Sequence, residues 1–415
     1  MNAAALEAVS KSSEPTDHRR SQVRVLHLNS MLKGGGTDDR SVKIASALMK
    51  LGHWTAMAGP AGREFSMVVS SLQIPFFPTA LGPLKLPFIV QTAGLIRREK
   101  IGIVHARHGR DYWPAILAAR LSRVRPKVVL SRHLARSPGS WLSRQYLLAR
   151  CDALLACSEF TKKVLCEGVY EPNSKDPERW KRGPMRGDFS KIKVVYGGID
   201  MSRFKPGDGT KQRDAWGLKP GNYAFGVVGF YDFPRGKGQR EFLQAAARIS
   251  TQKPEARFLI IGWGNMKEAL QSDIEKLGLK GRAWLTGLCR DMPAGMNAMD
   301  CLVHPAVSTE SWGSVICEAH ACGKPVIASD LDGIPEAFGA GAHGDLVKPD
   351  SVEALADAML QWAGRPALSE SQRSELHAKV AARYSLERAA AALSEAKSGG
   401  RNRCVCHVLP TRPLS

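Results

Sequence analysis

Two glutamates flank the predicted start of a helix in the segment 309–336, and seven residues separate Glu310 from Glu318. The helix is expected to begin near Gly313 and to end at Cys322, because a glycine and then a proline follow it. At such a start, backbone N–H groups are free and the helix dipole is positive, so an anion is favoured there. The predicted anion-binding segment consists of Ser311, Trp312, Gly313 and Ser314.

The chemistry suited to this arrangement is the binding of a diphosphate attached to sugars. Gly313 has no side chain to keep a phosphate at a distance. Glu318 lies about a turn and a half into the helix and could accept hydrogen bonds from ribose hydroxyls, whereas Glu310 could face a second sugar. The spacing fits equally well a surface acid at 310 and a structural glutamate at 318.

Three consecutive glycines follow the first predicted strand, in the segment 33–39 (KGGGTDD). Gly34, Gly35 and Gly36 tolerate positive φ and let backbone amides approach a phosphate or a sugar closely. Glycines in this place also form ordinary flexible turns, so the pattern alone leaves both interpretations open.

Histidines stand at the ends of predicted strands. His105 and His108, with Arg107 between them, end one strand, and His133 ends the next. The carboxyl ends of parallel strands meet at one edge of a sheet, where ligands of open α/β sheets bind. All three histidines are therefore placed for function, although a lone histidine at a strand end is often structural. His304 ends a later strand and is expected to be structural or to form part of a cleft wall.

These residues depend on an alternation of short apolar strands with helical patterns. Continuous hydrophobic strands separated by helices indicate parallel sheets that are covered on both faces. The strands are expected near residues 23–29, 54–58, 101–106, 127–132, 153–158 and 193–197, and again near 223–230, 256–262, 283–287, 301–306 and 325–329.

The alternation predicts an α/β protein with two Rossmann-like, doubly wound domains that face each other across a cleft. Residues 203–222 are rich in glycine, proline and charge and form the expected linker. The domains are thus predicted at 23–205 and 206–398, the second with closing C-terminal helices. The polar, unpatterned tails 1–22 and 399–415 are expected to be disordered.

The segment 309–336 resembles the most specific signature of glycosyltransferase family 4, whose members are retaining, nucleotide-sugar-dependent enzymes of the GT-B architecture. The likeness lies in the spacing of the two glutamates, in the following ACGKPVIASD and in the GIPE turn. Further family elements follow in the expected order, so the likeness covers about residues 23–396. They are the glycine loop, SEFTKKVL (158–165) and YGGID (196–200), in which Gly197 stands where the family usually has Asn.

The resemblance implies a role for each candidate residue. Glu310 acts on the donor sugar, Glu318 binds the ribose, and the backbone between them holds the diphosphate. His133 matches the family's active-site histidine, which lies near the donor sugar. The implied donor-binding residues also include Gly35 and Gly36, and the acceptor-side candidates are His105, Arg107 and His108.

The loop 229–239 (GFYDFPRGKGQ) occupies the place where family members carry an arginine and a lysine on the donor phosphates. Lys237 matches the lysine, but Phe230 stands at the arginine position and carries no charge. Arg235 is the candidate that would compensate for it. Both cations could also be solvated loop residues, a common place for Lys and Arg.

No cofactor and no metal are expected. Asp38 and Asp39 lie in the glycine loop and Asp330 and Asp332 follow a predicted strand, but neither pair is evidently placed to hold a divalent ion. The family generally neutralises the leaving diphosphate with a helix dipole and cations. The expected co-substrate is a nucleotide sugar of the UDP, GDP or ADP type.

The positive charge of the chain is concentrated in its first half. Residues 1–200 carry 32 Lys and Arg against 16 Asp and Glu, whereas residues 201–415 carry 27 against 23. In this architecture the first domain receives the acceptor, so the charge favours an anionic glycolipid or lipopolysaccharide-type acceptor, or an anionic membrane surface. A basic solubilising surface would have the same composition.

Nine cysteines at irregular spacings fit a reducing compartment. The N-terminal segment lacks the apolar stretch of a secretory signal, and prolines interrupt the most apolar region, 68–96. The sequence therefore predicts a cytoplasmic protein, at most peripheral on the cytoplasmic face of the inner membrane.

Two other functions are compatible with parts of the sequence. A nucleotide-sugar epimerase of the same architecture would share the donor site and need no acceptor. A basic nucleic-acid-binding protein would bind with steep salt dependence, but the basic residues are not interleaved with stacking aromatics, so no nucleic-acid partner is expected.

Overall fold

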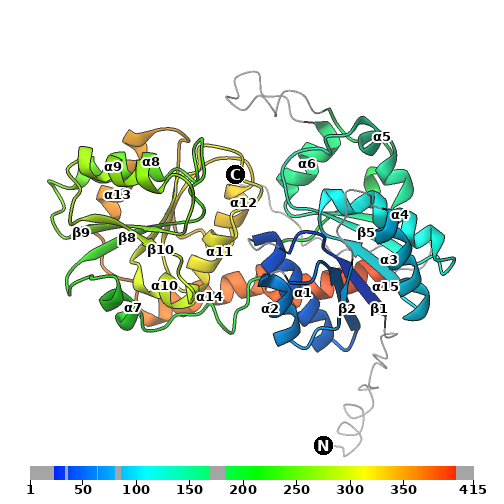
Figure 1. The fold of residues 1–415 in the computed structure, drawn as a ribbon. Coiled ribbons are helices and arrows are strands. Elements are labelled where there is room, and N and C mark those ends of the chain that lie inside the picture. The colour runs from blue at the N-terminus through cyan, green and yellow to red at the C-terminus, as the bar shows by residue number, and fades with distance from the viewer. Residues whose placement is uncertain (1–22, 33–35, 63, 80–85, 169–182, 399–415) are drawn as a thin grey trace, which may run out of the picture.

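Two parallel sheets, each with helices on both faces, make up the chain (Figure 1). This confirms the expected α/β class with two Rossmann-like domains. The expected tails and Gly35 lie outside the part of the chain that the structure, a computed structural model, describes. The described residues are 23–32, 36–62, 64–79, 86–168 and 183–398.

The first sheet has seven strands in the order β3-β2-β1-β4-β5-β6-β7. Its inner strands are almost wholly buried, as the continuous apolar runs require when helices cover both faces. The strands are β1 (Arg24–Leu28), β2 (Trp54–Gly59), β3 (Phe76–Pro78), β4 (Ile103–Ala106), β5 (Lys127–Arg132), β6 (Ala153–Ala156) and β7 (Ile192–Val194).

Helices cover the first sheet through two separate apolar layers. One layer joins the strands to α3, α4, α5 and α6, and the other joins them to α1. Serine side chains cap the N-termini of α5 and α6, at Ser140 and Ser158. The helices are α1 (Gly36–Lys50), α2 (Glu64–Ser71), α3 (Leu86–Arg98), α4 (Tyr112–Leu121), α5 (Trp141–Arg150) and α6 (Glu159–Glu167).

The second sheet has six strands in the order β10-β9-β8-β11-β12-β13. Its core strands β8, β9, β11 and β12 have buried apolar centres. The strands are β8 (Tyr223–Val228), β9 (Ala256–Ile261), β10 (Ala283–Gly287), β11 (Cys301–His304), β12 (Val326–Ser329) and β13 (Gly344–Val347).

The helices of the second half follow the same arrangement, except for the last one. Leu386, Ala390 and Leu393 of the final helix α15 pack against Ile44 and Leu48 of α1, so α15 crosses back to the first sheet (Figure 1). The helices are α7 (Thr210–Ala215), α8 (Gln239–Ile249), α9 (Lys267–Lys276), α10 (Met292–Ala298), α11 (Ser314–Ala321), α12 (Ile334–Phe338), α13 (Val352–Trp362), α14 (Glu370–Tyr384) and α15 (Leu386–Ser398).

The domains meet where their strands end. Figure 1 shows α11 and α12 of the second domain on the side that faces α1 and α6 of the first. The loop before α11 contacts the segments that follow β5 and β6: Ala135 N donates to Ser311 Oγ (2.9 Å), and Ser158 Oγ donates to Ser311 O (2.6 Å). The expected site therefore lies between two sheet edges.

Candidate active site

The helix predicted near Gly313 begins at Ser314, and Gly313 caps it in the left-handed region with φ of 80°. The segment before the helix rests on the turn after β12. Asp332 accepts a hydrogen bond from Glu310 N (3.2 Å), and Gly333 N donates to Glu310 O (3.1 Å). A Cβ at Gly333 would lie 2.2 Å from Ser311 O, so only glycine allows this approach. The positive end of α11 is thus held at the domain boundary.

Glu310 lies between a lysine and a histidine. Its Oε2 is 2.6 Å from Lys237 Nζ and 3.5 Å from His304 Nε2. Burial acts to raise the pKa of Glu310, but the ammonium of Lys237 and the contact with His304 outweigh it, so the pKa lies well below its ordinary value. Glu310 is therefore an ionised hydrogen-bond acceptor beside α11.

Glu318 is on α11 and faces charged residues of α1 in the other domain. Burial is the main cause that raises the pKa of Glu318, and Lys43 and Arg40 act against it. Asp39, another α1 residue, adds to the rise. A carboxyl group held in this way can accept hydrogen bonds from hydroxyl groups at low desolvation cost, since it is already removed from bulk water.

His133 follows β5 and lines a small cavity near the domain boundary. Both of its ring nitrogens are buried and have no hydrogen-bond partner among the described residues. Burial, and then the nearby cations Arg107 and Arg40, lower the pKa of His133 well below its ordinary value. The imidazole is therefore neutral at pH 7 and can donate one hydrogen bond and accept one.

A small cavity of about 10 Å³ lies beside His133, with room for about one water molecule. It is lined by side chains of α1 and α15 and of the strand ends and following segments of the first sheet. Its lining includes Arg40, Arg107, Ser131, His133, Cys157 and Tyr196.

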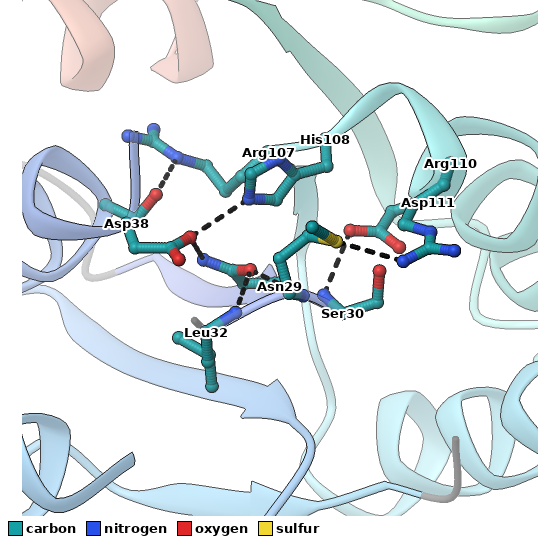
Figure 2. Close-up of polar contacts among 10 residues, drawn as sticks. Asn29, Ser30, Leu32, Asp38, Arg107, His108, Arg110 and Asp111 are labelled. Carbon is teal, nitrogen blue, oxygen red and sulfur yellow. Dashed lines mark hydrogen bonds and ion pairs between the residues drawn. The ribbon is translucent and has the colours of Figure 1, made fainter. Parts of the chain in front are cut away.

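Of the acceptor-side candidates, Arg107 and His108 meet α1, whereas His105 lies inside the sheet. His108 Nε2 is 3.0 Å from Asp38 Oδ1, and Arg107 Nε donates to Ser41 Oγ (2.9 Å), as Figure 2 shows. His105 is wholly buried, and its Nε2 is 2.7 Å from Ser131 Oγ. His105 therefore lies within the sheet and not at the edge that faces the second domain.

The two cations of the loop after β8 have different partners. Lys237 pairs with Glu310, whereas Arg235 lies 3.7 Å from a carboxylate oxygen of Asp350. Phe230 packs edge-to-face on Trp263, with ring centroids 5.1 Å apart. The structure therefore brings Lys237, but not Arg235, to the carboxylate at the helix start.

The expected donor-binding residues before α11 take on packing roles as well. The Trp312 side chain is 1% exposed and packs on the rings of Tyr196 and Tyr384, so it belongs to the core. Ser311 bridges the domains through the two hydrogen bonds described above. Gly36 begins α1. The backbone of residues 311–313 and the partly exposed Ser314, which begins α11, therefore remain as contacts for a diphosphate.

Sequence analysis missed a carboxylate that joins the domains. Glu336, at the N-terminal end of α12, accepts hydrogen bonds from the backbone N–H groups of Glu159 (2.8 Å) and Phe160 (2.7 Å), which begin α6. The Tyr196 hydroxyl donates a third, at 3.0 Å. The sequence feature that could have identified Glu336 is the glutamate of the GIPE turn, together with the start of α6, which offers free N–H groups.

Sequence analysis also missed Arg40. Its guanidinium lies 5.4 Å from the centre of the Trp312 ring, across the domain boundary. Nothing in the local pattern of α1 distinguishes Arg40 from a surface cation, so the signal lies only in the packing.

Among the described residues, no group of three or more His, Cys, Asp and Glu side chains is arranged to hold a metal ion. Within the same residues, no helix is both long and apolar enough to cross a bilayer.

Comparison with known proteins identifies both halves. The model of glycosyl transferases group 1 matches residues 209–376, and that of glycosyltransferase family 4 matches residues 34–175. The lipopolysaccharide core biosynthesis mannosyltransferase LpsB of Rhizobium meliloti (strain 1021) is 26% identical over 299 residues, which cover 70% of this chain and 77% of that protein.

A D-inositol 3-phosphate glycosyltransferase of Mycobacterium leprae (strain Br4923) is 31% identical over 315 residues, which cover 69% of this chain and 68% of that protein. The crystal structure of Anabaena HepE in complex with UDP and glucose aligns with a TM-score of 0.72 and 21% identity. This alignment covers 91% of the present chain and 100% of HepE, and it shows a shared fold.

Proposed function

This chain belongs to the glycosyltransferases of group 1 and family 4, and we propose that it transfers a sugar with retention from a nucleoside diphosphate sugar to an anionic envelope glycolipid. It is an enzyme of the GT-B type. The observation that carries the proposal is the position of Lys237, Glu310 and the start of α11 at one point between the two sheets.

In this proposal Lys237 and the positive end of α11 bind the donor diphosphate. The bond between the sugar and the diphosphate breaks during transfer, so negative charge grows on the departing oxygen. A cation and aligned backbone dipoles that are already in place stabilise that charge more in the transition state than in the bound donor. No metal ion is required in this scheme, and no cofactor beyond the nucleotide sugar.

The pairing of Lys237 with Glu310 suggests an exchange of partners. A diphosphate competes with the carboxylate for the ammonium at 2.6 Å. Glu310 then accepts hydrogen bonds from the donor sugar, while neutral His133 donates to the sugar from the first domain. Glu318 binds the ribose in the same scheme.

The acceptor is proposed to be a glycolipid of the lipopolysaccharide type. The support is the positive charge of residues 1–200 and the similarity to LpsB, whose name places it in lipopolysaccharide core biosynthesis. The new glycosidic bond forms to an acceptor hydroxyl, whose proton passes to the departing diphosphate, so the products are the glycoside and the nucleoside diphosphate.

The enzyme is proposed to act at an anionic membrane surface, on the cytoplasmic side of the inner membrane. An exposed face of α5 supports the contact with a membrane. Trp141 is 61% exposed, and Leu142 and Tyr146 are exposed beside it. Arg150 ends the helix. Aromatic and aliphatic side chains next to cations suit the boundary between headgroups and acyl chains. By contrast, most apolar residues of α3, including Phe88 and Ile96, are buried in the core.

The first test measures binding and slow hydrolysis of UDP-, GDP-, ADP- and CMP-sugars in the presence of EDTA. Thermal shift reports the binding, and nucleotide release reports the hydrolysis. We expect one nucleotide class to stabilise the protein and to be hydrolysed slowly. Glu310→Ala and Glu318→Ala should lose this response, whereas Glu370→Ala, an exposed glutamate of α14, should keep it. Full activity of both site variants would contradict the site, and conversion of the donor to its epimer would contradict the reaction.

A further inference from the structure

Arg107 is a buried cation whose donors are only partly used. The residue is 2% exposed, and its Nε donates to Ser41 Oγ at 2.9 Å. One terminal guanidinium nitrogen of Arg107 is buried and has no hydrogen-bond partner among the described residues. Figure 2 shows the terminal nitrogens of the Arg107 guanidinium pointing away from Asp38 and His108, with no dashed line to them. An unpaired buried N–H of this kind carries a desolvation cost that a bound acceptor group would remove.

A second arginine lies next to the first. Burial, and then the charge of Arg40, lower the pKa of Arg107 to about 9. Asp38 acts in the opposite direction but does not cancel these two effects. Both arginines line the cavity beside His133, whose imidazole is neutral for the reasons given above. This side of the cleft therefore holds two cations that repel each other, and an anion between them would stabilise both.

The structure makes room for Arg40 at one particular position. A Cβ at Gly197 would lie 2.5 Å from Cζ of Arg40 and 2.7 Å from one of its terminal nitrogens. Any other residue at 197, including the asparagine usual in the family, would displace the guanidinium. The φ angle of Gly197 is not positive, so a glycine is needed at this position for space and not for backbone conformation.

Arg40 also approaches the opposite domain, whose loop after β8 lacks one of the cations that the family usually has. Phe230 replaces the arginine that the family usually has after β8, and Arg235 is paired with Asp350. The Arg40 guanidinium approaches Trp312, next to the start of α11. Arg40 is therefore within the cleft and adjacent to the proposed diphosphate site.

We propose that Arg40 and Arg107 bind a phosphate group of a substrate on the first domain's side of the cleft. The group is either the diphosphate of the donor or a phosphate carried by the acceptor. Arginine suits both, because its planar fork makes paired hydrogen bonds to phosphate oxygens. The cavity of about 10 Å³ holds only about one water, so the phosphate enters from the Arg40 side with a movement of that side chain or of the domains. This inference rests on the proposed function for the identity of the substrates.

The test compares the wild type with Arg40→Gln, Gly197→Ala and Lys50→Gln. Arg40→Gln removes the cation, and Gly197→Ala displaces it without changing the charge. Lys50→Gln is the matched control, because Lys50 is an exposed cation at the other end of α1. All variants leave Arg107 in place, since a change at that buried residue could prevent folding.

Pyrophosphate and UDP are titrated by calorimetry, and KM is measured for one glycolipid acceptor with and without its phosphate groups. We expect Arg40→Gln and Gly197→Ala to weaken binding by about ten- to a hundredfold, the usual range for a charge-assisted contact. A loss in UDP affinity assigns the site to the donor. A higher KM for the phosphorylated acceptor alone, with UDP unaffected, assigns it to the acceptor.

Unchanged values for pyrophosphate, UDP and the acceptor in Arg40→Gln would overturn the proposal, as would an equal loss in Lys50→Gln. Failure of the proposed function would look different: the wild type would bind no nucleotide and transfer no sugar. The pyrophosphate titration would still decide whether Arg40 binds phosphate.

Discussion

Glu336 is predicted to control the closure of the two domains. The change is Glu336→Gln, which keeps the size of the side chain but removes its charge. The carboxylate accepts two backbone N–H groups from the start of α6 and the hydroxyl of Tyr196. The glutamine amide can still accept a hydrogen bond at its oxygen. Its NH₂ group, at the position of the other carboxylate oxygen, would face a donor and could not accept from it.

The size of the effect follows from these contacts. Loss of a negative charge at a helix N-terminus costs about 0.3 to 2 kcal/mol, and one unsatisfied donor costs about 1 to 3 kcal/mol. Burial raises the pKa of Glu336, so part of the gain from these hydrogen bonds is already offset by desolvation. We therefore expect the low end of the sum, about 1.3 kcal/mol, which is about a tenfold shift from the closed toward the open arrangement.

Small-angle scattering and sugar-transfer kinetics measure this shift. The variant should show a larger radius of gyration and a lower kcat/KM, with circular dichroism unchanged. Glu353→Gln is the matched control: it is an exposed glutamate in the first turn of α13 and contacts only its own domain through Arg248. Wild-type scattering and kinetics in Glu336→Gln would refute the reasoning.

Three further outcomes are expected. Lys237→Met should lower kcat by about 10²- to 10³-fold, because the cation acts on the charge of the transition state, and it should also destabilise the fold, because the buried carboxylate of Glu310 loses its ammonium partner; an unchanged kcat in steady-state assays would remove Lys237 from the mechanism. Glu318→Gln should mainly raise KM for the nucleotide sugar and leave kcat close to that of the wild type, which the same assays show. His320, whose pKa is lowered to about 4 mainly by burial, binds its proton first in the unfolded state, so the free energy of unfolding should fall by about 3 kcal/mol from pH 6.5 to pH 4. In His320→Gln, urea titrations across that range should show a smaller decline; an identical decline would place the acid sensitivity elsewhere.

Much of the fold was predictable because the central strands are continuous apolar runs between helices. The runs that contain Ile103–Ala106 and Val326–Ser329 are buried on both faces, and their short length and the helical patterns beside them identify such runs as strands. Of the four edge strands, β7 and β10 were predicted, near 193–197 and 283–287, whereas β3 and β13 were missed. Phe76–Pro78 is short and lies between prolines, and Gly344–Val347 includes a glycine and an aspartate, so neither has a strand pattern.

The candidate site was predictable where a residue's role depends on the local backbone. The start of α11 follows from Gly313 and its neighbours. Roles that depend on contacts between domains were not: Glu336 and Arg40 acquire theirs from segments far away in the sequence. Arg235 shows that closeness in sequence does not ensure a shared role. It is close to Lys237 in the loop, but it pairs with Asp350, whereas Lys237 pairs with Glu310.

The most direct test of the account is the anomeric configuration of the transferred sugar. The nucleotide sugar that binds best in the screen is incubated with lipopolysaccharide-type glycolipid and EDTA, and the product is analysed by NMR. The account predicts a glycoside with the same anomeric configuration as the donor, formed by the wild type and lost in Glu310→Ala. A product of inverted configuration, or full transfer by Glu310→Ala, would contradict it.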